Sequence, residues 1–139
     1  MSCNKRFVSI IDDDVHITKL FHEVLRQNID EVMVFAFTDP IMALEHFTTN
    51  KKNFALVISD LKMPGLNGLE LLKRVKDANA KVRTILMSAH NFEEEKYYQK
   101  YIENQIINST IEKSITVNRL YQRVTEQLKI YQDGITGMC

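Results

Sequence analysis

The sequence has 139 residues, of which 45% are hydrophobic and 26% are charged, an ordinary balance for a soluble globular protein. Its 18 basic residues are offset by 18 acidic ones, so it lacks the basic excess typical of nucleic-acid binding. The longest apolar runs have the length of strands, and no signal-peptide pattern opens the chain. We therefore expect a cytoplasmic protein that binds neither membranes nor nucleic acid.

The cysteines and histidines do not predict a metal site. Cys3 and Cys139 lie at opposite ends of the chain and lack the paired spacing of a zinc site or a disulfide framework. His22 and His46 fall on predicted helices, where a surface or core role is commoner than metal ligation. Any chemistry must therefore come from other side chains.

Apolar runs and helical periods alternate five times along the chain. The last apolar run is interrupted by Asn108 and Ser109, as is typical of an edge strand. The five expected strands are Phe7–Ile11, Val32–Phe37, Ala55–Ser59, Val82–Ser88 and Ile106–Ile111.

A helix is predicted after each strand. Asp14 is placed to cap the first helix, and Pro40 suits a first helical turn, where its missing N–H would have no partner anyway. Two of the expected helices span about Val15–Gln27 and about Ile115–Tyr131, the latter ending before Asp133-Gly134. The other three begin at Pro40, near Leu69 and around Phe92.

Two of these helices carry a clear apolar stripe at helical spacing. In the first helix, the stripe is Ile17, Leu20, Phe21, Val24 and Leu25. In the last helix, it is Val117, Leu120, Tyr121, Val124, Leu128 and Tyr131. We expect both stripes to face the core.

Near-continuous apolar strands that alternate with helices indicate a parallel sheet covered on both faces. The predicted fold class is α/β, a doubly wound (βα)5 domain with a five-stranded parallel sheet, for which we take the order 2-1-3-4-5. The length favours a single domain over residues 1–139, with a core of about 6–131 and a short tail over 132–139.

The polar residues of chemical interest all follow predicted strands. Asp12 and Asp13 follow the first strand, Asp60 ends the third, Ser88 ends the fourth, and Lys113 follows the fifth. In the predicted strand order these side chains meet at one crevice, the edge where open α/β sheets bind ligands.

A cation is needed where carboxylates meet in this way. Two ionised carboxylates about 4 Å apart repel by roughly 4 kcal/mol near a protein surface. An oxygen-rich site with room for water suits Mg²⁺. With a metal bound, Asp60 is left as an oxygen nucleophile, and Lys113 and Ser88 can hold oxygens of a phosphoryl group, as aspartyl-phosphate chemistry requires.

From about Arg6 to Tyr131 the chain resembles a response-regulator receiver domain, a CheY-like phosphoacceptor of two-component systems. The segment with the spacing D-x-x-M-P-x-x-N-G is specific within this fold. The motifs that carry the resemblance are Ile11-Asp12-Asp13-Asp14, Asp60 to Gly68 (DLKMPGLNG), Leu86-Met87-Ser88-Ala89 and Glu112-Lys113.

The resemblance implies a role for each residue of the crevice. Asp60 is the expected phosphoacceptor, and Ser88 and Lys113 are expected to bind the phosphoryl oxygens. The expected Mg²⁺ ligands are Asp13, Asp60, the backbone carbonyl of Lys62, and Asp12 directly or through water. The expected donor is a phosphohistidine on a sensor histidine kinase or a phosphotransfer protein.

Two positions depart from the family pattern. Ser114 replaces the proline that usually follows the active-site lysine, and we expect the Lys113–Ser114 bond to keep the family's cis geometry despite a cost of about 3–4 kcal/mol. Thr110 stands where the family has an aromatic switch residue, and it cannot fill the same space. The separation between Ser88 and Lys113 is also a few residues longer than usual.

Helix four offers a hypothesis for signalling without that aromatic residue. It carries Phe92, Tyr97, Tyr98 and Tyr101, whose bulk could replace the missing ring, or which could simply pack the helix. Lys62 and His90 are expected near the path of the water that removes the phosphoryl group.

The leading interpretation is a stand-alone receiver that is phosphorylated on Asp60, depends on Mg²⁺ and switches partner binding. It is not an enzyme in the metabolic sense, since it catalyses only its own phosphorylation and dephosphorylation. We expect an unknown downstream protein to bind the face of helix 4, strand 5 and helix 5, and a homodimer is left open. Direct control of transcription is not expected, because no output domain follows Tyr131.

Two alternatives remain at this point. One is a degenerate receiver that binds partners without phosphorylation, as Ser114 and Thr110 allow. The other is a phosphatase or phosphotransferase of the haloacid-dehalogenase type, which also uses a strand-end aspartate and Mg²⁺. That family needs a second aspartate two residues after its nucleophile, where this chain has Lys62.

Overall fold

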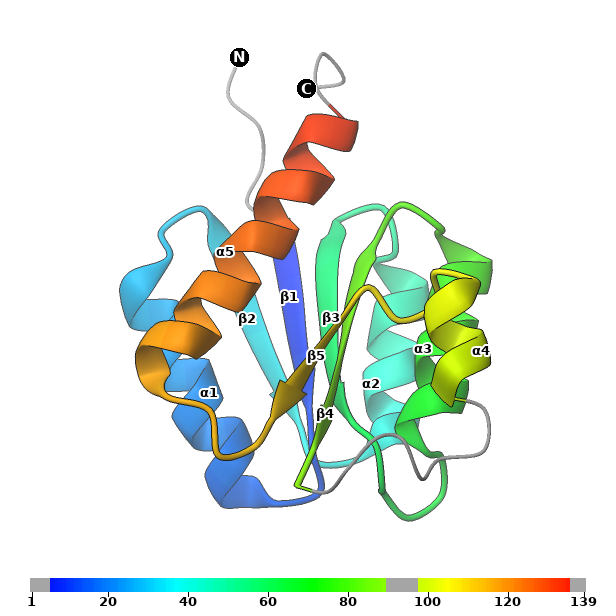
Figure 1. The fold of residues 1–139 in the computed structure, drawn as a ribbon, viewed down its shortest axis with the longest axis horizontal. Coiled ribbons are helices and arrows are strands. Elements are labelled where there is room, and N and C mark those ends of the chain that lie inside the picture. The colour runs from blue at the N-terminus through cyan, green and yellow to red at the C-terminus, as the bar shows by residue number, and fades with distance from the viewer. Residues whose placement is uncertain (1–5, 90–97, 136–139) are drawn as a thin grey trace.

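The computed structural model describes residues 6–89 and 98–135, which form a five-stranded parallel sheet with helices on both faces (Figure 1). The sheet order is β2-β1-β3-β4-β5, and every neighbouring pair is parallel. The strands are β1 (Arg6–Ile11), β2 (Val32–Phe37), β3 (Phe54–Asp60), β4 (Arg83–Ser88) and β5 (Ser109–Glu112). The predicted fold class and strand order are confirmed.

Five helices alternate with the strands. Asp14 caps the first of them by accepting a hydrogen bond from the His16 amide at 2.9 Å, and Pro40 opens the second, both as predicted. None of the helices in the described ranges is long and apolar enough to cross a membrane. The helices are α1 (Val15–Asn28), α2 (Pro40–Thr49), α3 (Gly68–Ala78), α4 (Tyr98–Glu103) and α5 (Val117–Gly134).

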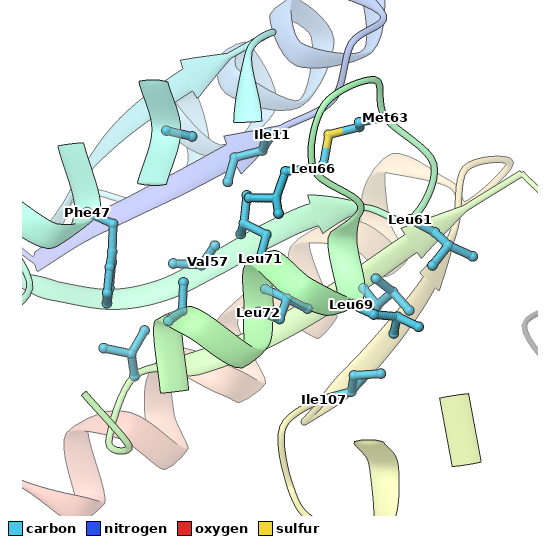
Figure 2. Close-up of a cluster of buried hydrophobic side chains, with 14 of the residues drawn as sticks. Ile11, Phe47, Val57, Leu61, Met63, Leu66, Leu69, Leu71, Leu72 and Ile107 are labelled. Atoms are coloured by element: carbon cyan, nitrogen blue, oxygen red, sulfur yellow. The ribbon is translucent and has the colours of Figure 1, made fainter. Parts of the chain in front are cut away.

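The core lies in two layers, one on each face of the sheet. On one face α3 packs over the central strands, and Figure 2 shows Leu72 of this helix near Val57 of β3 and Leu69 farther along, toward Leu61 and Ile107. On the other face α1 and α5 bury Phe21, Leu25 and several aliphatic residues against the same strands. All seven residues of β3 are buried, because helices cover both of its faces.

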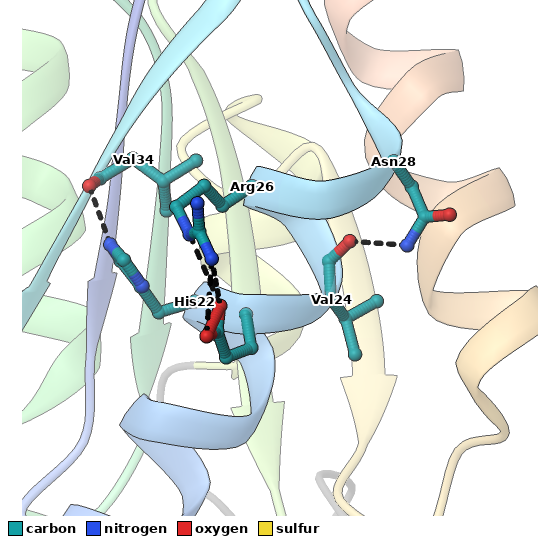
Figure 3. A network of polar contacts seen from close by, with 6 residues as sticks. His22, Val24, Arg26, Asn28 and Val34 are labelled. Atoms are coloured by element: carbon teal, nitrogen blue, oxygen red, sulfur yellow. Dashed lines mark hydrogen bonds and ion pairs between the residues drawn. The ribbon is translucent and has the colours of Figure 1, made fainter.

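Polar contacts fasten α1 to the edge of the sheet and close its last turn (Figure 3). The Nε2 atom of His22 donates a hydrogen bond to the Val34 carbonyl of β2 at 3.0 Å, so this histidine has a structural partner, as expected. The side chain of Asn28 donates to the Val24 carbonyl, one of the last carbonyls of the helix. The His22 bond holds α1 beside β2, and the Asn28 bond closes the last turn of the helix.

The predicted apolar stripes are correct at their centres and wrong at their edges. Phe21, Val24 and Leu25 of α1 are buried, as are Leu120, Val124 and Tyr131 of α5. Three residues of the predicted stripes are instead exposed: Leu20 (53%), Val117 (51%) and Tyr121 (38%). Each helix rests on the sheet along a line narrower than its apolar sector, so residues at the sector's margin face solvent.

The last strand begins three residues later than predicted, at Ser109 rather than Ile106. The amides of Ile106 and Ile107 bond to the Tyr101 carbonyl, so this segment closes the end of α4. Asn108 then joins β4 through bonds between its backbone and side chain and Thr84. The strand lies at the edge of the sheet, as predicted.

The final helix runs from Val117 to Gly134 rather than from about Ile115 to Tyr131, because Thr116 caps it through a hydrogen bond from the Arg119 amide. The start predicted for helix four, around Phe92, lies outside the described residues, as do Tyr97, His90 and both cysteines. Tyr98 and Tyr101 are partly buried against the α3 side of the core, which agrees with a packing role.

Candidate functional site

Strand register brings the predicted acidic residues to one edge of the sheet. Ile11 of β1 pairs with Ser59 of β3, so the following residues, Asp12 and Asp60, are neighbours across the two strands. The Leu61 amide donates to the Met87 carbonyl at 2.8 Å and continues the β3–β4 pairing past Asp60. The backbone therefore fixes this edge before any side-chain contact is made.

Three carboxylates gather here. One oxygen from each of Asp12, Asp13 and Asp60 lies within 4.8 Å of the others. Asp12 and Asp60 are buried, with 0% and 4% of their surface exposed, while Asp13 is exposed to solvent. The cluster therefore combines two buried carboxylates with one that faces solvent.

A single ammonium group joins the two buried carboxylates. The Nζ atom of Lys113 lies 2.8 Å from Oδ2 of Asp12 and 3.1 Å from Oδ1 of Asp60. The Lys113 amide also donates to the Ser88 carbonyl at 3.0 Å, which fixes the start of the β5–α5 connection against the end of β4. The convergence of Lys113 with the aspartates was predicted. Its ion pair with Asp12 was not.

The surroundings of the two buried carboxylates shift their pKa values. Burial, together with repulsion from Asp12, raises the pKa of Asp60 to about 6, even though the ammonium of Lys113 favours the charged form. Burial likewise raises the pKa of Asp12. For Lys113, hydrogen bonds and charge attraction from both aspartates outweigh its own burial and raise its pKa. The ammonium of Lys113 therefore does not fully offset the negative charge of the two buried carboxylates.

The donor set fits a divalent, oxygen-preferring cation. Oδ1 of Asp12 accepts the Asp14 amide at 3.0 Å, and its buried Oδ2 lies 2.8 Å from the Lys113 ammonium. Three neighbouring carboxylates, one of them exposed to solvent, offer the oxygen ligands that Mg²⁺ prefers. The Lys62 carbonyl stays a predicted ligand.

The turn after Asp60 is built around two glycines. Gly65 has a φ of 88°, a left-handed conformation that favours glycine. At Gly68 a Cβ would lie 2.2 Å from the Asp60 carbonyl oxygen, so only glycine allows α3 to begin this close to the phosphoacceptor candidate. Asn67 caps the helix by accepting the Glu70 amide at 2.9 Å. The motif thus positions Asp60 through backbone packing.

The remaining predicted residues lie on β4 and β5. Ser88 is buried as the last residue of β4, one position beyond the Asp60–Met87 pair. Thr110 is half-buried in β5 and lines an open cavity of about 520 Å³ between this strand and α5. The expected cis bond between Lys113 and Ser114 was wrong, since every peptide bond in the described ranges is trans.

Two structural roles at this edge were not predicted from the sequence. Gly68 was noted only as part of a motif, and its close contact with the Asp60 carbonyl depends on how α3 meets β3. The bond from the Asp14 amide to Asp12 also depends on the turn, although an acidic run before a helix was a signal that could have suggested it.

The fold and the acidic edge together define a class of protein, the CheY-like α/β domains. Residues 8–125 match the model of a family described as the response regulator receiver domain. Because this match covers most of the chain, the protein belongs to the response regulator receiver domain family.

Known relatives agree with this assignment. Over 83 residues, 60% of this chain, the sequence is 34% identical to Sporulation initiation phosphotransferase F of Bacillus subtilis. It is 32% identical over 90 residues to the transcriptional regulatory protein FixJ of Bradyrhizobium diazoefficiens. The matches span 64% and 40% of the length of these two relatives.

Solved structures agree on the fold. A CheY-like response regulator receiver domain protein from Methanospirillum hungatei superposes with a TM-score of 0.81 at 19% identity, covering 94% of this chain and 99% of that chain. The receiver domain of AraT from Geobacillus stearothermophilus gives 0.78 at 23% identity, covering 93% of this chain and 97% of that chain. At these identities the likeness concerns the fold alone.

Proposed function

We propose that this receiver domain accepts a phosphoryl group on Asp60 and thereby changes the proteins it binds. The observation that carries the proposal is the contact of one ammonium, that of Lys113, with both buried carboxylates of the cluster, at 2.8 and 3.1 Å. A lysine held there can stabilise negative charge that arrives at Asp60 during phosphoryl transfer.

The proposed donor is a phosphohistidine on a sensor histidine kinase or a phosphotransfer protein. An Oδ atom of Asp60 attacks phosphorus, the new P–O bond forms as the P–N bond breaks, and the imidazole leaves with the electron pair of that bond. The ammonium of Lys113 and the hydroxyl of Ser88 then bind oxygens of the phosphoryl group. In hydrolysis, water attacks the same phosphorus and returns Asp60 as a carboxylate together with inorganic phosphate.

Asp12, Asp13 and Asp60 would hold Mg²⁺, with the Lys62 carbonyl as a further ligand. The bound ion would supply positive charge that screens the carboxylates from one another and from the incoming phosphoryl group. The chain's own part is to keep three carboxylate oxygens within 4.8 Å of one another on strand ends that cannot move apart.

Partner binding is proposed for the face formed by α4, β5 and α5, in a cytoplasmic setting, with a homodimer left open. The domain would turn over no metabolite and would catalyse only its own phosphorylation and dephosphorylation. The second candidate is a degenerate receiver that binds partners without phosphorylation. Thr110, a small residue beside an open cavity, is the feature that favours it.

The deciding experiment is intact-mass measurement after incubation with acetyl phosphate and Mg²⁺. We expect one phosphoryl adduct on the unaltered chain, and none on Asp60→Asn or in the presence of a chelator. Asp77→Asn, which removes an exposed carboxylate on α3, is the matched control and should be phosphorylated normally. A folded, Mg²⁺-binding protein that forms no adduct would favour the degenerate receiver.

A further inference from the structure

A second cavity lies at the opposite edge of the sheet from Asp60. It has a volume of about 530 Å³ and is lined by residues at the amino ends of the strands, such as Arg6, Val32 and Ala55, and by the last turns of α5. In Figure 1 these turns of α5 rise above the amino ends of β1 and β3. The volume falls within the range of about 300–1,000 Å³ typical of small-molecule sites.

The walls of this cavity, which we call the amino-edge pocket, are mostly apolar. Ile29, Val32 and Leu128 form its sides, and Ala55 and Tyr131 belong to a small buried cluster beneath it. Tyr131 is 7% exposed and lines the pocket, with the Arg6 guanidinium over its ring. The apolar part of a ligand, aromatic or aliphatic, can therefore displace water from this cavity favourably.

One cationic side chain of the pocket, that of Arg6, forms no ion pair with the residues that the structure describes. The guanidinium carbon of Arg6 lies 5.6 Å from the centre of the Tyr131 ring. Its Nε atom is buried and meets no hydrogen-bond acceptor among residues 6–89 and 98–135. A buried donor without an acceptor costs free energy that an anionic ligand would recover.

The rim adds one more positive charge and one negative charge. Lys129 and Glu31 both line the pocket and both are exposed, so water screens them. The charge of Arg6, which is partly buried against Tyr131, is screened least by water. It therefore makes the pocket favour a negatively charged ligand.

We propose that the amino-edge pocket binds a small amphipathic carboxylate, whose apolar body lies against Leu128 and Tyr131 and whose carboxylate pairs with Arg6. A planar guanidinium suits a carboxylate because it can donate two parallel hydrogen bonds. The site is separate from the Asp60 cluster, so the proposal does not depend on phosphorylation.

The test is titration of the ¹⁵N-labelled chain with naphthylacetate, observed through backbone amide shifts. Naphthylacetamide, which has the same ring without the charge, is the matched ligand. We expect saturable shifts confined to the lining residues and at least tenfold weaker binding of the amide. Arg6→Gln should weaken naphthylacetate binding at least tenfold, whereas Arg6→Lys should retain most of it.

Arg119→Gln, which removes an exposed arginine of α5 outside the pocket, and Asp60→Asn should both leave binding within twofold of the unaltered chain. Equal affinity for the acid and the amide would overturn the proposal, and this comparison needs no variant to fold. Shifts spread over other surfaces would also overturn it. So would lining-residue shifts that change with protein dilution alone, because a second copy would then cover the pocket.

Discussion

At the residue scale, the phosphoacceptor candidate is an aspartate whose burial opposes its charge. The pKa of Asp60 is raised to about 6, first by burial and second by repulsion from Asp12. Lys113 offsets only part of this cost, although its ammonium touches both carboxylates. The residue that carries the chemistry therefore destabilises the fold at neutral pH, as functional sites often do.

Asp60→Asn is expected to be more stable than the unaltered chain in metal-free buffer at pH 7.5, by roughly 1–3 kcal/mol. The folded-state pKa of Asp60 lies above its unfolded value of 3.8, so its stabilising effect is full below pH 3.8 and is lost as the pH rises through about 6. Urea unfolding between pH 4 and pH 8 measures the difference. For Asp30→Asn, an exposed loop substitution, the difference in the free energy of unfolding from the unaltered chain should not grow with pH. If this difference stayed constant with pH for Asp60→Asn, the argument would be contradicted.

Gly68→Ala is expected to lower the free energy of unfolding by about 2–3 kcal/mol, because its Cβ would lie 2.2 Å from the Asp60 carbonyl oxygen and backbone cannot yield cheaply. Gly134→Ala is the matched control, since its Cβ would meet nothing within 4 Å, and it should be neutral or slightly stabilising. Chemical denaturation of both variants decides the question. Equal stability of the two variants would disprove the close-contact argument.

At the element scale, α3 links the phosphoacceptor turn to the core. It begins at Gly68 against the carbonyl of Asp60, is capped by Asn67, and buries Leu69, Leu72 and Val75 on one face of the sheet. Its start therefore affects both stability and the placement of Asp60. The segment after β5 differs, since Lys113 and Ile115 are only partly buried and Ser114 and Thr116 are exposed.

Asn67→Ala is expected to cost about 1 kcal/mol of stability, because it leaves the Glu70 amide without its 2.9 Å acceptor. Asn67→Asp keeps a side-chain oxygen in the same place and adds a charge that the helix N-terminus favours, so it should lose little. Thermal unfolding of the two variants is the measurement. A loss of equal size in both would mean that the cap oxygen is unimportant.

At the scale of the whole molecule, the sheet separates two edges with different chemistry. The carboxyl edge collects three carboxylates and Lys113, while the amino edge forms an apolar pocket beside Arg6. Parallel strands make this separation possible, since every strand end of one kind lies on one side. Binding of a cation at the carboxyl edge should therefore stabilise the whole fold.

Mg²⁺ at about ten times its dissociation constant is expected to stabilise the fold by about 1.4 kcal/mol, since it binds only the folded chain. Asp13→Asn removes an exposed member of the carboxylate group and should abolish most of this gain while it leaves the metal-free stability nearly unchanged. Thermal unfolding with and without Mg²⁺ measures both. An undiminished gain in Asp13→Asn would place the ion elsewhere.

The sequence alone determined the fold class, the strand order and the acidic edge. Apolar runs such as Phe54–Ile58 are long enough to identify buried parallel strands, and a carboxylate at the end of such a run, as at Asp60, can only point to one edge. The cap at Asp14 and the first-turn proline at Pro40 were equally local, because a helix start depends on residues within one helical turn.

Only the tertiary structure decided which margins of the helices are exposed, where β5 begins and how Lys113 pairs. Leu20 and Leu25 are equally hydrophobic and stand at opposite margins of the predicted stripe, and the way α1 lies on the sheet exposes one and buries the other. The contact of Lys113 with Asp12 and the pocket around Arg6 both join residues distant in sequence. Such contacts depend on packing between elements, which no local pattern specifies.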